Sequence, residues 1–285
     1  VTLTLAAVFG TASLAVSGGD GRARRGSCAA AAALSMTALC AWSIGLVPDF
    51  GAAPRSGAQK PMHEAMRREN GRIVDFAWGP AGRADLYEHP AFPNIKWLYN
   101  DATNSSYLVR EPDTPARQAF LRRLLLNLPF ALRRPARVLL IGPGAGIELH
   151  LARLAGAASV DAVEVNRASV GLVRRWAAFT GGVYDAPGVR VHIAEGRRFL
   201  ASARGRYDLI QLSLAFTATA FSGSFALAEG HLYTVEALSL YLRRLTPDGL
   251  LAVLDDSRQR ALRTVLTALE AFEAEGVSAA AAMGR

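Results

Sequence analysis

Cysteine is scarce in this chain, which has only Cys28 and Cys40 among its 285 residues. Both lie in one uncharged run, so the sequence indicates neither a disulfide framework nor a cysteine-based metal site. The spacings of histidine and acidic residues that are typical of zinc and calcium sites are also missing, and we expect no metal. The net charge of +8 is scattered along the chain. Nucleic-acid binding would need a basic stripe with interleaved aromatics, so we expect no nucleic-acid partner.

Charge is missing from most of the front of the chain. Residues 1–19 and 26–48 carry no charged side chain. Within the second run, residues 28–47 are apolar or small, and about 20 such residues span a bilayer. We therefore predict transmembrane segments within residues 1–48, with the first run as the end of another span. A signal peptide fits less well, because the basic cluster follows the first run instead of preceding it.

A strand, turn, helix and second strand are indicated within residues 137–164. Gly142, Gly144 and Gly146 follow the first apolar run, and Glu164 closes the second, 18 positions after the last glycine. This order is typical of a nucleotide-binding βαβ unit. Glycine lets the backbone turn tightly and approach a ligand, and a carboxylate at this place can accept hydrogen bonds from both ribose hydroxyls. An ordinary βα turn is the alternative, but the acid favours nucleoside binding.

The remaining sequence places this unit in an α/β domain. Residues 49–71 are expected to form a linker, and the short extended runs of 72–112 indicate a small antiparallel β-domain. In residues 113–285 a helix over 114–132 precedes five strands that alternate with helices, and Pro247–Gly249 forms a turn before the last strand. This alternation predicts an open parallel sheet covered on both faces. After the last helix, the alanine-rich residues SAAAAMGR offer no further strand.

In this order of parts the chain resembles the spermidine synthase family of polyamine aminopropyltransferases, over about residues 72–254. In particular, it looks like the bacterial membrane proteins in which such a domain follows transmembrane helices. The family joins a small β-domain to a Rossmann-like domain of the class I S-adenosylmethionine-dependent methyltransferase type. The sheet of that type usually closes with a C-terminal hairpin, which is expected to be missing here. The resemblance implies that IGPGAG binds S-adenosylmethionine or its decarboxylated form. It assigns Glu164 to the ribose, and Glu195 with Gly196 to the adenine, whereas Ala145 replaces the family's usual acid.

The resemblance also points to a substitution in the catalytic motif. The fourth strand of the family ends in D-S-S-D, whose first acid accepts a proton from the attacking amine, and Ser213 and Phe216 occupy the two acidic positions here. A serine without a base cannot take a proton from an ammonium group. The sequence therefore leaves activity open. Other candidate acids are Glu229, before the last helices, and Asp208, which lies early in its strand and is expected to be structural.

Three functions are compatible with these features. The first is a membrane-tethered transferase that moves an aminopropyl or methyl group to a small amine acceptor. The second is a non-catalytic nucleoside-binding or regulatory domain of a multi-span membrane protein, and the third is a transport or scaffold protein. His150 and His192 could serve as bases in any of them but are expected to be structural. The expected partners are the lipid bilayer and a second copy of the chain in a homodimer.

The orientation signals in the sequence disagree. The basic loop at residues 22–25 should be cytoplasmic, which would place the remainder of the chain outside. The segment that follows the predicted span is basic as well, and nucleoside cofactors are found in the cytosol. We therefore expect a protein of the bacterial inner membrane, with its soluble domain in the cytoplasm.

Overall fold

The computed structural model describes residues 61–80, 82–213, 231–255 and 257–283. The predicted transmembrane segments of residues 1–48 lie outside these ranges. Internal contacts divide the chain into units 1–55 and 56–285, and the described residues all belong to the second unit. Among them, no helix combines the length and the hydrophobicity needed to cross a bilayer.

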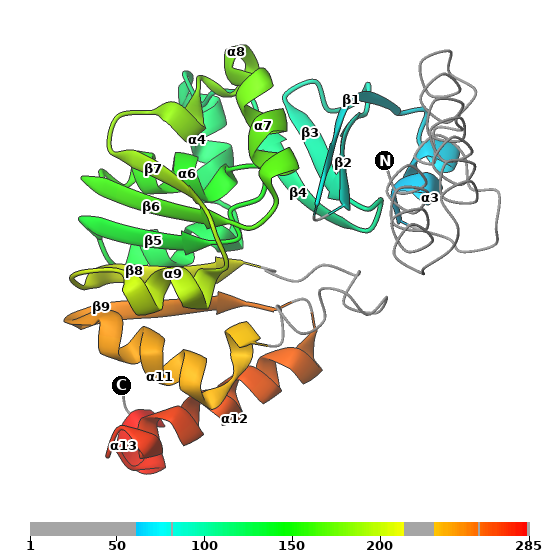
Figure 1. Cartoon of the computed structure of the whole chain (residues 1–285). Coiled ribbons are helices and arrows are strands. Elements are labelled where there is room, and N and C mark those ends of the chain that lie inside the picture. Colours follow the sequence, from blue (N-terminus) through cyan, green and yellow to red (C-terminus); the bar gives the residue numbers. More distant parts are fainter. Residues whose placement is uncertain (1–60, 81, 214–230, 256, 284–285) are drawn as a thin grey trace, which may run out of the picture. The chain divides into compact units, whose positions relative to one another are not determined.

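The first part of the described chain forms an antiparallel meander, as the sequence predicts (Figure 1). Its strands are β1 (Arg72–Gly79), β2 (Gly82–Glu88), β3 (Ile95–Asn100) and β4 (Asn104–Val109). The helix α3 (Pro61–Arg68) packs on this sheet. Its Met62 is buried with Tyr87 and Tyr99, and the Met62 amide donates a 3.1 Å hydrogen bond to the carbonyl of Ala102. We call the four strands β1 to β4 the small sheet.

The second part contains a parallel sheet, which confirms the α/β prediction. In the described residues the strand order is β7-β6-β5-β8-β9, and every neighbouring pair is parallel. The strands are β5 (Arg137–Ile141), β6 (Ser159–Glu164), β7 (Val189–Ile193), β8 (Tyr207–Ser213) and β9 (Leu245–Leu254). The chain adds β6 and then β7 on one side of β5, and afterwards adds β8 and β9 on the other side. The carboxyl ends of β5 and β8 therefore mark the topological switch point, where ligands bind in open α/β sheets.

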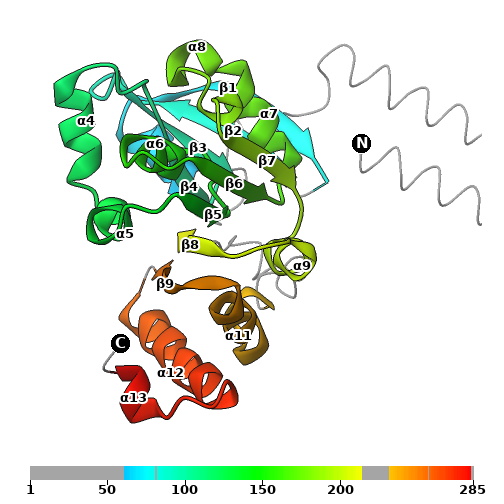
Figure 2. The same ribbon diagram turned by 90° about the vertical axis from the view of Figure 1, so that its left-hand side faces the viewer.

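Alternation along β5 separates two hydrophobic cores, one on each face of the sheet. Val138 and Leu140 pack in one core, and Leu139 and Ile141 in the other. Figure 2 shows helices on both sides of the strands. The first core includes α6 (Ile147–Leu154) and α7 (Arg167–Arg175), and the second includes α9 (Gly196–Ser202), α11 (Val235–Arg244) and part of α12 (Arg258–Ala274). Because both faces are covered, β5 is apolar and buried from Val138 to Ile141.

Two elements differ from those predicted from the sequence. The helix expected over 114–132 is broken into α4 (Pro115–Arg122), η1 (Leu125–Asn127) and α5 (Leu128–Leu132). Pro129 explains the break, because proline has no N–H for a continuing helix but fits the first turn of a new one. The predicted turn Pro247–Gly249 lies inside β9. There Leu245 pairs with Tyr207 and Leu250 with Leu209, so the intervening residues bulge from the ladder.

The remaining described elements are short. They are α8 (Ala177–Thr180), η2 (Val183–Asp185), η4 (His231–Tyr233) and α13 (Ala279–Met283). The element that follows α12 is thus helical, and β9 has β8 as its only strand partner in the described chain.

Candidate functional site

The glycine-rich turn connects β5 to α6 at the switch point. Gly142, Gly144 and Gly146 have φ angles of +71°, +54° and +88°, in the left-handed region that other residues avoid. At Gly144 the surroundings add a second restriction. A Cβ there would lie 2.5 Å from the Oγ of Ser106, which leaves no room for any side chain. Conformation and packing together account for the alternate glycines.

Side chains from two other elements hold this turn. The Oγ of Ser106, in β4 of the small sheet, accepts a 2.9 Å hydrogen bond from the Ala145 amide. The hydroxyl of Tyr184, in η2, donates a 2.6 Å hydrogen bond to the carbonyl of Gly144. Neither contact could be foreseen from the sequence, because both residues are distant from the turn along the chain. The small sheet therefore takes part in shaping the turn.

Glu164 lies at the carboxyl end of β6 and is 6% exposed. Its Oε2 accepts a 3.1 Å hydrogen bond from the amide of Gly144, and its Oε1 accepts a 2.9 Å bond from the amide of Asn166. Burial raises the pKa of this carboxyl, although hydrogen bonds from the amides of Asn166, Gly144 and Val165 oppose the shift. The carboxylate is thus directed at the glycine-rich turn, and since a carboxylate has about four acceptor positions, it can accept from a further donor. These acceptors fit the hydroxyls of a ribose, and the assignment of Glu164 to ribose stays a prediction.

Asn166 joins the end of β6 to the small sheet. Its Oδ1 accepts from the Ala168 amide and so caps α7, while its Nδ2 donates a 2.8 Å hydrogen bond to the Oδ1 of Asn100 in β3. The same oxygen of Asn100 accepts from the Ser169 hydroxyl at 2.9 Å. The small sheet is therefore bonded to the parallel sheet beside Glu164 as well as at the turn.

The two residues predicted at the adenine have structural roles of their own. The carboxylate oxygens of Glu195 accept from the amides of Arg197 and Arg198 at 2.8 and 2.7 Å, which caps the N-terminus of α9. Gly196 is buried, and a Cβ on it would approach Ile141 Cγ2 to 2.5 Å. Both residues lie at the carboxyl end of β7, on the ligand-binding edge of the sheet. Contact with an adenine stays a prediction.

Ser213 ends β8 and contacts a buried acid, Glu148, that is not among the site residues predicted from the sequence. Its Oγ accepts a 3.0 Å hydrogen bond from the Nε2 of Gln211. The Ser213 hydroxyl is also hydrogen-bonded to the side chain of Glu148, which is 5% exposed in the first turn of α6. Burial, with a smaller contribution from the neighbouring charge of Glu164, raises the pKa of Glu148 to about 7, against opposing hydrogen bonds from its own amide and Ser213. The sequence shows an acid two positions after Gly146, but not that it is buried.

The two candidate histidines have different surroundings. His150, in α6, is 2% exposed, and neither ring nitrogen has a hydrogen-bond partner within the described residues. Burial lowers its pKa to about 4, and Arg153 adds to the shift. His192, in β7, lies 3.0 Å through Nε2 from the Oδ1 of Asp161. Neither ring is bonded to the residues of the glycine-rich turn.

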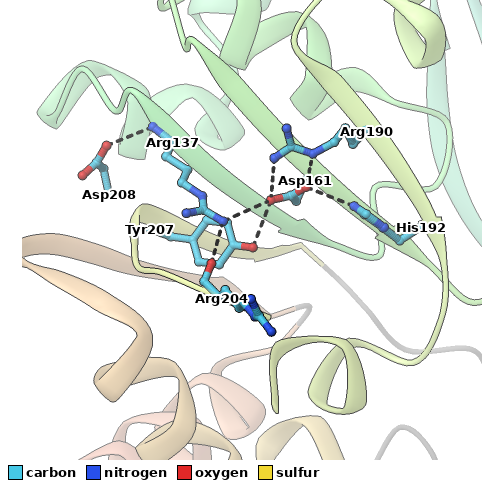
Figure 3. Close-up of polar contacts among 7 residues, drawn as sticks. All are labelled: Arg137, Asp161, Arg190, His192, Arg204, Tyr207 and Asp208. Atoms are coloured by element: carbon cyan, nitrogen blue, oxygen red, sulfur yellow. Dashed lines mark hydrogen bonds and ion pairs between the residues drawn. The ribbon is translucent and has the colours of Figure 1, made fainter. Parts of the chain in front are cut away.

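Asp161 is the centre of a polar network on the second face of the sheet (Figure 3). It accepts from Arg190 at 2.9 Å and from the hydroxyl of Tyr207 at 3.0 Å, in addition to the contact with His192. Burial alone would raise its pKa, but these hydrogen bonds prevail and lower it. The network joins β6, β7 and β8 and is structural.

The remaining candidate acids do not add to the described site. The Oδ2 of Asp208 accepts from the amides of Ala136 and Arg137 at 3.0 and 2.9 Å, which ties the beginnings of β5 and β8. Asp208 is therefore at the opposite end of the strand from Ser213. Glu229 and Phe216 lie outside the described residues. Within the described ranges no group of three histidine, cysteine or acidic residues could hold a metal ion.

Comparison with solved structures identifies the fold. A spermidine synthase in complex with the transition-state analogue AdoDATO matches with a TM-score of 0.54 and 20% identity, covering 71% of this chain and 64% of that one. The spermidine synthase of Thermotoga maritima matches with a TM-score of 0.53 and 18% identity, over 71% and 64%. The chain thus spans less than two thirds of either synthase. No protein-family model and no curated protein matches it. At this identity the likeness shows a Rossmann-like, methyltransferase-type sheet preceded by an antiparallel sheet.

Proposed function

We propose that this chain binds S-adenosylmethionine or decarboxylated S-adenosylmethionine at the glycine-rich turn and transfers an aminopropyl or methyl group to a small amine. One observation carries the proposal. The buried carboxylate of Glu164 is directed at the Gly144 amide, beside the switch point of the parallel sheet. The fold shared with spermidine synthases, one of them in complex with AdoDATO, supports the same class of ligand.

The described residues have separate parts in this proposal. Glu164 accepts hydrogen bonds from the ribose hydroxyls, and Glu195 accepts one from the adenine amino group. The glycines allow the backbone to come close to the ligand because no Cβ intervenes. When bound, the sulfonium group supplies an electrophilic carbon. Catalysis by the protein then consists mainly of positioning, together with a group that takes the proton of the amine.

A second function is favoured by Ser213. This residue occupies the position of the proton-accepting aspartate in the spermidine synthase family. The alternative is therefore a nucleoside-binding or regulatory domain without turnover. The uncharged runs at residues 1–19 and 26–48 support a membrane anchor for either function. We place the protein in the bacterial inner membrane with this domain in the cytoplasm, where nucleoside ligands are found.

Calorimetry on the purified full chain tests the proposal. We expect methylthioadenosine, S-adenosylmethionine or its decarboxylated form to bind. Glu164→Gln should weaken binding about 10-fold to 100-fold, because hydrogen bonds to a charged acceptor contribute about 1.5–3 kcal/mol. The control is Glu270→Gln, which removes an exposed charge from α12 and should leave affinity unchanged.

The result separates the two functions. If none of the three nucleosides binds, both functions are refuted. If they bind, release of methylthioadenosine in the presence of putrescine or spermidine shows aminopropyl transfer, and methylation of the amine shows methyl transfer. Binding without either product favours the regulatory alternative.

A further inference from the structure

A chain of hydrogen bonds links three side chains across the switch point. The Nε2 of Gln211 donates to the Oγ of Ser213 at 3.0 Å, and the Ser213 hydroxyl is hydrogen-bonded to Glu148. Gln211 and Ser213 are two positions apart in β8, so both project to the face of the sheet that α6 covers. Glu148 approaches from the first turn of α6, directly after the glycine-rich turn. The polar cluster thus sits between the proposed nucleoside site and the end of β8.

The cluster is buried, and one of its acceptor atoms has no donor within the described residues. Glu148 is 5% exposed and Gln211 is 3% exposed. The Oε1 of Gln211 has no hydrogen-bond partner among the described residues, although its own Nε2 is bonded to Ser213 and, at 3.4 Å, to the carbonyl of Leu126. Buried polar atoms without partners are uncommon, and each calls for a ligand or a functional reason. A ligand that offers N–H donors would satisfy this oxygen.

We propose that Glu148, with Ser213 and Gln211, forms the acceptor site, where it binds the protonated nitrogen of a primary amine and takes its proton. This inference rests on the proposed transferase function. In the step, one N–H bond of the ammonium breaks and its proton moves to the Glu148 carboxylate. The bonding pair stays on nitrogen as a lone pair. An ammonium ion and a carboxylate thereby become a neutral amine and a carboxylic acid.

The electrostatic surroundings of Glu148 suit this role. Its neighbours include the carboxyl of Glu164 in β6 and the hydroxyl of Tyr184 in η2, and neither is a cation. Burial raises the pKa of Glu148 to about 7. A proton acceptor is most effective when it titrates near the working pH. A cationic nitrogen would also supply the counter-charge that a buried carboxylate needs. The acid missing at position 213 is therefore replaced by one that reaches the same place from α6.

Proton release on amine binding provides a test that does not depend on turnover. Putrescine or spermidine is titrated into the full chain, saturated with methylthioadenosine, in two buffers of different ionisation enthalpy. At pH 6 free Glu148 is mostly protonated, so pairing with an ammonium should release about one proton, and at pH 8 the release should approach zero. Glu148→Gln should release no proton at either pH and bind the amine at least tenfold more weakly. Glu270→Gln is the control and should behave as the parent.

A kinetic measurement complements the calorimetry. Glu148→Gln should lower kcat about 10²-fold to 10⁴-fold, the usual contribution of a positioned acid or base. Adding Ser213→Asp to this variant should restore part of the lost rate, because it returns a carboxylate to the same place. A purely structural Glu148 would show no rescue beyond the change in rate that Ser213→Asp alone makes in the parent.

Each outcome discriminates. If the parent binds methylthioadenosine but Glu148→Gln keeps its amine affinity and proton release, the inference fails and the proposed function stands. If Glu148→Gln weakens methylthioadenosine binding and leaves amine binding unchanged, the carboxylate serves the nucleoside ligand, and the inference is refuted. If the parent binds no nucleoside, the proposed function fails and this inference falls with it.

Discussion

Replacing His150 by leucine should make the protein less sensitive to acid. His150 is 2% exposed, and burial lowers its pKa from 6.5 to about 4. Between these values the unfolded chain binds a proton that the folded protein does not, so stability is lost as the pH falls through this window. At about 1.4 kcal/mol per pKa unit, the full shift corresponds to roughly 3 kcal/mol. About 2 kcal/mol of this should be lost between pH 7 and pH 5.

Urea unfolding of the full chain, followed by tryptophan fluorescence, measures this effect at pH 5 to 7.5. At pH 7.5 the leucine variant should lie within about 1.5 kcal/mol of the parent, because the volumes are similar and two unpartnered nitrogens are removed. Between pH 7.5 and pH 5, the difference in free energy of unfolding between variant and parent should shift by about 2 kcal/mol in favour of the variant. Glu148 titrates in the same range with the opposite sign, but its contribution is common to both proteins and cancels in the difference. His231→Asn, which removes an exposed imidazole, is the control. Parallel stability curves for parent and leucine variant would refute the reasoning.

Two further predictions concern the packing around the site. Asp161→Asn should lower the free energy of unfolding by roughly 2–4 kcal/mol at pH 7, because it removes the charge from a buried network. Asp185→Asn is the comparison: it breaks the exposed ion pair with Arg174 and should lower the free energy of unfolding by less than about 1 kcal/mol. Since the pKa of Asp161 is lowered, its contribution should disappear as the pH falls through and below 3.8, and an unchanged acid profile would contradict this. Gly144→Ala should cost more than about 2 kcal/mol in thermal unfolding, from left-handed strain plus collision with Ser106. Gly156→Ala, with φ +83° and nothing within 4 Å of the added Cβ, isolates the strain alone, and equal losses would rule out the collision.

The fold could be predicted largely because its signals are local. Residues 137–164 contain apolar runs of strand length, glycines at alternate positions and an acid at the end of the second strand, and each can be recognised from the sequence alone. The break at Pro129 and the bulge at Pro247–Gly249 were less accessible. In both places the proline was visible, but its effect depended on where the neighbouring elements pack.

The candidate site could be predicted only in part, because some of its contacts join distant residues. Ser106 and Tyr184 reach the glycine-rich turn from other elements, and nothing in their own sequence neighbourhoods marks them. Glu148 illustrates the limit. An acid in the first turn of a helix is common on surfaces, where it favours the helix dipole. Only the arrangement of α6 over β8 shows that this one is buried against Ser213.

The hydrogen bond from the Ala145 amide to Ser106 has a practical consequence for anyone who trims this protein. A fragment beginning at residue 113 would include the whole parallel sheet yet lose the serine that accepts a hydrogen bond from its glycine-rich turn. Such a fragment would expose the backbone N–H of residue 145, and a weak affinity measured on it would reflect the cut instead of the native site. Shortened versions intended for crystallisation or screening should therefore begin upstream of β1.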